Sequence, residues 1–150
     1  MSVVIIIGST DLVGFEAAFF FAHPRFDVVD ADNDMRRAFF GDEASTLWQR
    51  GNLERRLGKV YRHVDTDVGD SESIDALFKE YGKAVQLVID SAAQPTHDWA
   101  ARDPITDFTV NANGTLNLLE AARKFSREAP FIFTSTNKVY GDTPNALPLQ

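Results

Sequence analysis

Apolar and polar residues alternate along the chain in blocks that predict strands and helices in turn. Longer segments with the spacing of amphipathic helices lie at about 12–22, 71–81 and 106–126, and residues 31–58 predict one or two further short helices. Ser71 is the expected N-cap of the helix over 71–81. Short runs rich in β-branched or aromatic residues are typical of buried strands, and they lie at Val3–Gly8, Phe26–Asp30, Val60–Val64, Gln86–Asp90 and Phe131–Ser135.

Strands that alternate with helices predict an α/β fold, a doubly wound parallel sheet with helices on both faces. We expect one domain over residues 1–150, with five strands in the order 3-2-1-4-5. Sheets of this kind bind ligands beyond the carboxyl ends of their strands, where the strand order reverses. The predicted crevice therefore lies between the ends of the first and fourth strands.

The turn after the first strand carries glycines that are typical of a nucleotide-binding turn. It reads Gly8-Ser9-Thr10-Asp11-Leu12-Val13-Gly14 and leads directly into a predicted helix. Backbone N–H groups at such a helix start can hold a pyrophosphate, so the candidate cofactor-binding residues here are Gly8, Asp11, Leu12 and Gly14. The alternative is a plain turn in which Asp11 or Thr10 serves as the helix N-cap.

Asp32 and Asn33 stand at the end of the second predicted strand and are further candidates for cofactor binding. Asp32 follows Gly14 by eighteen residues. A carboxylate there can accept hydrogen bonds from both hydroxyls of an adenosine ribose and repel a 2′-phosphate, which favours NAD over NADP. Arg36 and Arg37 follow closely and favour a phosphate instead. A third interpretation is a solvated acidic turn.

Composition narrows the range of partners. The chain has 15 Lys and Arg against 22 Asp and Glu, a net charge of −7, which argues against nucleic acid and anionic membranes as partners. It has no cysteine, so disulfides and thiolate metal sites are excluded, and its three scattered histidines suggest no metal site. Val3–Ile7 is too short to span a membrane and no basic segment precedes it, so we expect a cytoplasmic protein.

Several stretches together carry a family resemblance. They are the glycine turn, Asp67-Val68, SAAQP at 91–95, NANGTLNLLEA at 111–121 and FIFTSTNKVYGD at 131–142. The chain resembles the N-terminal part of an extended short-chain dehydrogenase/reductase of the NAD-dependent epimerase/dehydratase family, and within it the epimerases of CDP-sugars and related nucleotide sugars. The resemblance implies an NAD-binding Rossmann domain that is incomplete at its C-terminus.

The resemblance also implies roles for particular residues. Asp67 and Val68 would contact the adenine, Ala92 and Ala93 would lie along the cofactor, and Asn111 would help to fix the cofactor site. Thr136 falls where the family places a catalytic hydroxyl, although a threonine is also common at a strand end. The family's reaction passes through a keto-sugar, with a hydride transferred to NAD and returned.

The chain departs from the family's pattern at positions that bear on activity. Asp11 replaces a glycine of the turn, so we expect its side chain to obstruct and repel a pyrophosphate. Asp90 replaces a usual histidine and adds negative charge. The family's Tyr-x-x-x-Lys pair is absent, so we expect the isolated chain to be inactive. The alternative function is a non-catalytic Rossmann-like module that binds nucleotide weakly or not at all.

The helix expected over 106–126 carries two apolar stripes. One contains Phe108, Ala112, Thr115, Leu119 and Ala122, and the other contains Val110, Leu118, Ala121 and Phe125. One stripe is expected to pack on the sheet and the other on a second copy of the chain. With the family's use of this helix in dimers and an open fifth strand, we expect a homo-oligomer.

Overall fold

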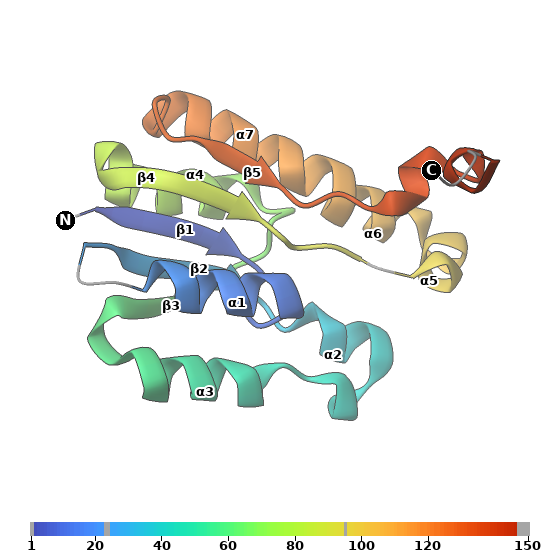
Figure 1. The fold of residues 1–150 in the computed structure, drawn as a ribbon, viewed down its shortest axis with the longest axis horizontal. Coiled ribbons are helices and arrows are strands. Elements are labelled where there is room, and N and C mark those ends of the chain that lie inside the picture. The colour runs from blue at the N-terminus through green and yellow to red at the C-terminus, as the bar shows by residue number, and fades with distance from the viewer. Residues whose placement is uncertain (1, 23–24, 95, 147–150) are drawn as a thin grey trace.

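The computed structural model describes residues 2–22, 25–94 and 96–146 and confirms the predicted sheet. Five parallel strands are hydrogen-bonded in the order β3-β2-β1-β4-β5. Figure 1 shows all their arrows pointing the same way, with α2 and α5 beyond the arrow tips. The strands are β1 (Val3–Ile7), β2 (Asp27–Asp32), β3 (Tyr61–Asp65), β4 (Val85–Asp90) and β5 (Phe131–Phe133).

The predicted helices are present with differences at their ends, and a further helix at His97–Arg102 lies where the sequence predicts a loop. The helices are α1 (Leu12–Phe21), α2 (Met35–Phe40), α3 (Leu47–Leu57), α4 (Ser71–Tyr81), α5 (His97–Arg102), α6 (Pro104–Phe108) and α7 (Gly114–Phe125). The N-cap of α4 is Asp70 and not Ser71, because the Asp70 carboxylate accepts hydrogen bonds from the backbone N–H groups of Glu72 and Ser73.

The first strand is apolar throughout because helices cover both faces of the sheet. Val3, Ile5 and Ile7 face a core shared with α4 and α7, whereas Val4 and Ile6 face a second core shared with α1 and α3. All five side chains are fully buried. β1 therefore forms the centre of both cores. The amphipathic pattern expected over 12–22 is not found, because α1 carries apolar residues on all sides and exposes Leu12, Val13 and Phe20.

The helix expected over 106–126 is not a single regular helix. A π-helical segment, Thr109–Asn113, separates α6 from α7, and the N–H of Gly114 donates to the carbonyl of Thr109 five residues back. Of the first predicted stripe, Ala122 is buried, whereas Leu119 is 44 % exposed and Phe108 is 60 % exposed, so this stripe does not face the sheet as a whole. The second predicted stripe, including Leu118, packs on the sheet.

Asp90 ends β4 in a buried position, with 2 % of its surface exposed. The hydroxyl of Thr115 on α7 donates to its carboxylate over 2.9 Å. Burial raises the pKa of Asp90, and the hydrogen bonds from Thr115 and the Ala92 N–H only partly oppose that effect. The ionised carboxylate therefore makes an unfavourable contribution to folding.

The turn between β1 and α1 depends on two glycines. Gly8 has a φ of +79°, a backbone conformation that residues with a Cβ rarely adopt. Gly14 packs directly on the same turn, since a Cβ at Gly14 would lie 2.2 Å from the Gly8 carbonyl oxygen. The N-terminus of α1 is thereby held against the carboxyl end of β1.

Gly14→Ala is expected to lower the free energy of unfolding by about 2–3 kcal/mol, because the added methyl group forces backbone apart in a packed core. Gly51→Ala is the matched control, a helical glycine with nothing within 4 Å of an added Cβ, and it should raise stability by about 0.5–1 kcal/mol. Urea unfolding measures both. Equal stability of the two variants would contradict the close packing at Gly14.

Asp90→Asn is expected to be more stable than the wild type at pH 7 by a margin that shrinks on acidification. Because the pKa of Asp90 is raised on folding, its ionised form costs stability above that pKa, and protonation removes the cost as the pH falls through it. Asp70→Asn is the control of opposite sign, since hydrogen bonds from Ser73 and Glu72 lower the pKa of Asp70. Urea unfolding at pH 7 and pH 4 tests both, and a margin for Asp90→Asn that does not change with pH would refute the expectation.

Candidate functional site

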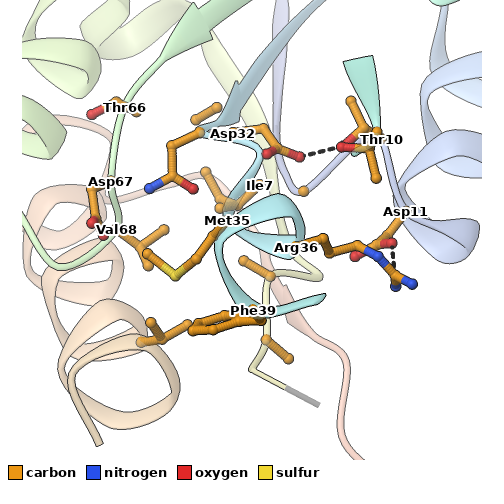
Figure 2. A pocket seen from close by; sticks show the side chains of 17 residues that line it. Ile7, Thr10, Asp11, Asp32, Met35, Arg36, Phe39, Thr66, Asp67 and Val68 are labelled. Atoms are coloured by element: carbon orange, nitrogen blue, oxygen red, sulfur yellow. Dashed lines mark hydrogen bonds and ion pairs between the residues drawn. The ribbon is translucent and has the colours of Figure 1, made fainter. Parts of the chain in front are cut away.

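A cavity lies at the carboxyl ends of β1, β2 and β4, where the sequence predicts a crevice. Figure 2 shows that Asp32 and Thr10 lie at one side of it and that Asp67 and Val68 form the opposite wall. The predicted cofactor-binding residues that line it are Gly8, Asp11, Asp32, Asn33, Asp67, Val68, Ala92 and Ala93. The structure therefore brings together residues from four separate strand ends.

A second cavity adjoins the first. It contains the two predicted site residues that have polar side chains and do not line the first cavity. It is lined by Asn111 and Thr136, and it shares Ala92 and Ala93 with the first cavity. Asp32 thus lines the first of two adjoining cavities and Thr136 the second. This is the arrangement that a ligand extending across the strand ends requires.

Leu12 and Gly14 line neither cavity. The Leu12 side chain is 80 % exposed, so any part it has in binding falls to its backbone at the start of α1. Gly14 acts from behind the site, because its close approach to Gly8 sets the position of the helix.

Asp11 fits the turn without backbone strain. Its φ of −92° and ψ of 170° are extended values, so the position does not need a glycine for conformational reasons. It occupies the N-cap position of α1, yet its side chain accepts no capping hydrogen bond. Instead, its carboxylate pairs with Arg36 of α2 over 3.0 Å. The charge that was expected to repel a pyrophosphate is therefore balanced by a guanidinium.

Asp32 presents a partly desolvated carboxylate to the first cavity. Its Oδ2 accepts from the Thr10 hydroxyl at 2.5 Å, and its Oδ1 accepts from the Asp34 N–H at 2.8 Å. Burial raises the pKa of Asp32, and the hydrogen bond from Thr10 opposes that rise. Each oxygen has a second lone pair, so the carboxylate can still accept hydrogen bonds from a ligand.

Two arginines near Asp32 point away from it. Arg37 pairs with Asp42 over 2.6 Å at the surface, and Arg36 pairs with Asp11. Neither forms an ion pair with Asp32 within the part of the chain that the structure describes. The expectation that these arginines favour a phosphate beside Asp32 is therefore not supported by the side-chain positions.

Sequence reasoning missed the threonines and the acidic turn that support Asp32. Thr10 Oγ1 lies 2.8 Å from Thr46 Oγ1, and Asp34 accepts hydrogen bonds from both the Thr46 N–H at 2.7 Å and the Ser45 hydroxyl at 2.7 Å. These contacts join residues more than ten positions apart. No local pattern in the sequence signals them.

A buried polar cluster beneath the glycine turn was also missed. The Asp30 carboxylate accepts from the Ser9 N–H at 3.0 Å and the Tyr61 hydroxyl at 2.9 Å, and His63 Nδ1 lies 2.7 Å from it. The signal available in the sequence was an acidic residue at the end of the predicted strand Phe26–Asp30, directly after two valines. The cluster ties the turn after β1 to β2 and β3.

Asn111 connects the two elements that flank the second cavity. Its side chain accepts from the Gln94 N–H at 2.9 Å and donates to the Gln94 carbonyl at 3.2 Å and to Asp107 Oδ1 at 3.0 Å. The loop after β4 is thereby attached to the π-helical segment. These contacts suit the positioning role that the resemblance implies for Asn111.

Asp67 and Val68 form the wall opposite Asp11 (Figure 2). Asp67 Oδ1 accepts from the Gly69 N–H at 2.7 Å, and Val68 packs so closely on Gly114 that a Cβ there would lie 2.6 Å from its methyl carbon. Asp90, by contrast, lines neither cavity. Its side chain points to Thr115, so the negative charge expected at the site is directed into the protein.

Comparisons with known proteins identify relatives with the same fold. The chain is 30 % identical over 138 residues to CDP-paratose 2-epimerase of Salmonella typhi, covering 92 % of this chain and 38 % of that protein. It is 26 % identical to the solved UDP-glucose 4-epimerase of Bifidobacterium longum in complex with NAD+ and UDP, with a TM-score of 0.77 over 99 % of this chain and 41 % of that one.

A second solved relative gives the same result. The chain is 26 % identical to the UDP-glucose 4-epimerase of Thermus thermophilus in complex with NAD, with a TM-score of 0.73 over 99 % of this chain and 42 % of that one. The chain thus spans about two fifths of the length of these relatives. Among the helices that the structure describes, none is long and apolar enough to cross a bilayer.

The family is identified by a match over almost the whole chain. The sequence profile of the NAD dependent epimerase/dehydratase family matches residues 4–150, and the fold agrees with that match. The chain belongs to the NAD dependent epimerase/dehydratase family.

Proposed function

We propose that these residues form the NAD-binding part of an enzyme that epimerises or dehydrates a nucleotide sugar. The observation that carries the proposal is a pair of cavities that share Ala92 and Ala93, with Asp32 lining the first and Thr136 the second. Relatives of this fold are solved with NAD at 26 % identity. Bound NAD would supply the site with a hydride acceptor and donor.

The residues of the first cavity fit an adenosine and a pyrophosphate. Asp32 would accept hydrogen bonds from the ribose hydroxyls, and its negative charge disfavours a 2′-phosphate, so NAD is the expected form. Gly8 leaves the turn open for backbone N–H groups at the start of α1 to meet a phosphate. Asp67 and Val68 would lie beside the adenine, and Ala92 and Ala93 would leave room for the rest of the dinucleotide.

The second cavity is the proposed place of the sugar. Thr136 would hold the sugar hydroxyl near the reacting carbon. Asn111 would hold the loop after β4 in position beside the sugar. Both residues line this cavity together with Ala92 and Ala93. We propose a nucleotide sugar as the substrate because the relatives are named as epimerases of CDP-paratose and UDP-glucose.

These residues are proposed to supply cofactor binding and not the catalytic base. Tyr61, Tyr81 and Tyr140 are the tyrosines of the 150 residues, and none is followed by lysine four positions later. Burial and the Asp30 charge raise the pKa of Tyr61 far above its usual value, so it cannot serve as a base near neutral pH. The 150-residue chain mixed with NAD and a CDP- or UDP-sugar should accordingly give no product.

Asp11 favours a second candidate function, a Rossmann-like module that no longer binds a dinucleotide. Its side chain stands where the family has a glycine, and it lines the first cavity. The pairing with Arg36 weakens this candidate, because the charge at the turn is balanced. Binding measurements distinguish the two.

Calorimetric titration with NAD should show binding in the micromolar range, and Asp32→Asn should weaken it about tenfold by removing a charged acceptor of the ribose hydroxyls. The variant should also reduce the preference for NAD over NADP. Asp27→Asn is the matched control, since Asp27 lies at the opposite end of the same strand. No binding of NAD at millimolar concentration would favour the second candidate function.

An exposed apolar stripe supports the proposal that the chain forms a homodimer. It runs along α6 and α7 and contains Ile105, Phe108, Leu116 and Leu119, which are 44–75 % exposed. The spacing of these residues places them on one side of the helix. Such a stripe is larger than the scattered apolar side chains usual on a monomer.

Sedimentation at tens of micromolar is expected to show a dimer, and the double variant Phe108→Glu/Leu119→Glu should shift it to monomer, because charges replace the apolar contact. Phe20→Glu is the control, since Phe20 is 79 % exposed but belongs to α1, which packs with the other core of the sheet. A wild-type monomer at this concentration would rule out the dimer.

A further inference from the structure

We propose that Arg36 is a ligand of the cofactor pyrophosphate and that Asp11 is the partner of its guanidinium until the cofactor binds. The inference rests on the proposed binding of NAD and extends it to a residue outside the glycine turn. On binding, the phosphate oxygens would replace the Asp11 carboxylate as the partner of Arg36. Arg36 would then supply affinity for the pyrophosphate that is lost where Asp11 replaces the glycine of the family's turn.

The geometry places the guanidinium at the phosphate end of the cavity. Arg36 extends from α2 to Asp11, the residue immediately before α1, and its Nη1 lies 3.0 Å from Asp11 Oδ1 (Figure 2). Both residues line the same cavity as Gly8. A dinucleotide that follows the glycine turn must therefore pass the guanidinium.

Charge at this point favours a phosphate over the carboxylate. The N-terminus of α1 carries partial positive charge, and Arg36 adds a full one beside it. The Arg36 and Asp11 side chains are 43 % and 38 % exposed, and an ion pair with that exposure is weak. A guanidinium binds phosphate oxygens through two parallel hydrogen bonds, so the exchange of partners is favourable.

The helix that carries Arg36 is fixed at both ends. At its start, Asp34 accepts hydrogen bonds from the Thr46 N–H and the Ser45 hydroxyl, each at 2.7 Å. At its end, the Trp99 indole N–H donates to the Phe39 carbonyl at 2.8 Å. Arg36 is thus held near its proposed ligand before binding, which reduces the entropy lost when the complex forms.

The same arginine is less suited to a 2′-phosphate. That group would lie on the ribose, which the proposed function places at Asp32, whereas Arg36 points to Asp11. Arg37 is directed to Asp42 at the surface and does not line the cavity. Arg36 is therefore the residue to test, and the neighbouring Arg37 is its control.

The test is calorimetric titration of Arg36→Ala and Arg37→Ala with NAD, NADP and adenosine. Arg36→Ala should weaken NAD and NADP alike, about tenfold or more, and leave adenosine unchanged, because both dinucleotides carry the pyrophosphate and adenosine does not. Arg37→Ala should bind all three as the wild type does. Unchanged adenosine binding also shows that the variant is folded, and Arg36→Lys, which keeps the charge without the paired donors, should give an intermediate loss.

A second pair of variants tests the part of Asp11. Asp11→Asn keeps the size of the side chain and removes its charge, so it should tighten NAD binding in the presence of Arg36. In the Arg36→Ala background, the change in NAD affinity caused by Asp11→Asn should differ from the change in the presence of Arg36, since the two side chains interact directly. Equal effects of Asp11→Asn in both backgrounds would contradict the exchange of partners.

The outcomes separate this inference from the proposed function. If the wild type binds no NAD, the proposed function fails. If it binds NAD and Arg36→Ala matches Arg37→Ala, the proposed function stands and the inference is overturned. A loss confined to NADP would assign Arg36 to the 2′-phosphate and overturn it as well.

Discussion

The close contact between Gly14 and the Gly8 carbonyl is the constraint on which the site depends. A Cβ at Gly14 would lie 2.2 Å from that oxygen, so α1 can approach the end of β1 only with a glycine there. The approach fixes where α1 begins. It also determines where Asp11 stands, and through Asp11 where the guanidinium of Arg36 lies. The position of α1 beside the cavity therefore follows from this backbone contact.

The sheet order and most elements were predictable because the apolar runs and the glycines record local constraints. Val3–Ile7 is apolar at every position since both its faces are covered, and such a run is typical of a central parallel strand. The π-helical segment at Thr109–Asn113 was not predictable, because a helix with one extra residue shows nearly the same apolar spacing. The N-cap is Asp70 and not Ser71. The sequence does not decide between these adjacent residues, because aspartate and serine are both common N-caps.

Most of the candidate cofactor residues were found from their places at strand ends, whereas their partners were not. Asp32 follows directly from its position after β2, but Thr10 and Thr46 reach it only through the fold. The same holds for Asp11, whose charge suggested repulsion until its pairing with Arg36 was seen. Whether a charge obstructs or assists a ligand depends on a tertiary contact that the sequence pattern does not contain.

The π-helical segment sets the rotational phase of everything that follows it. One residue corresponds to roughly 100° of rotation along a helix, so the surplus residue in Thr109–Asn113 decides which side of α7 meets the sheet. Asn111 lies inside this segment and anchors the loop after β4. A regular α-helix of the same residues would rotate Leu118 out of the core and bring Asn117 toward it. The length of this one turn thus couples the inner site to the outer surface of the domain.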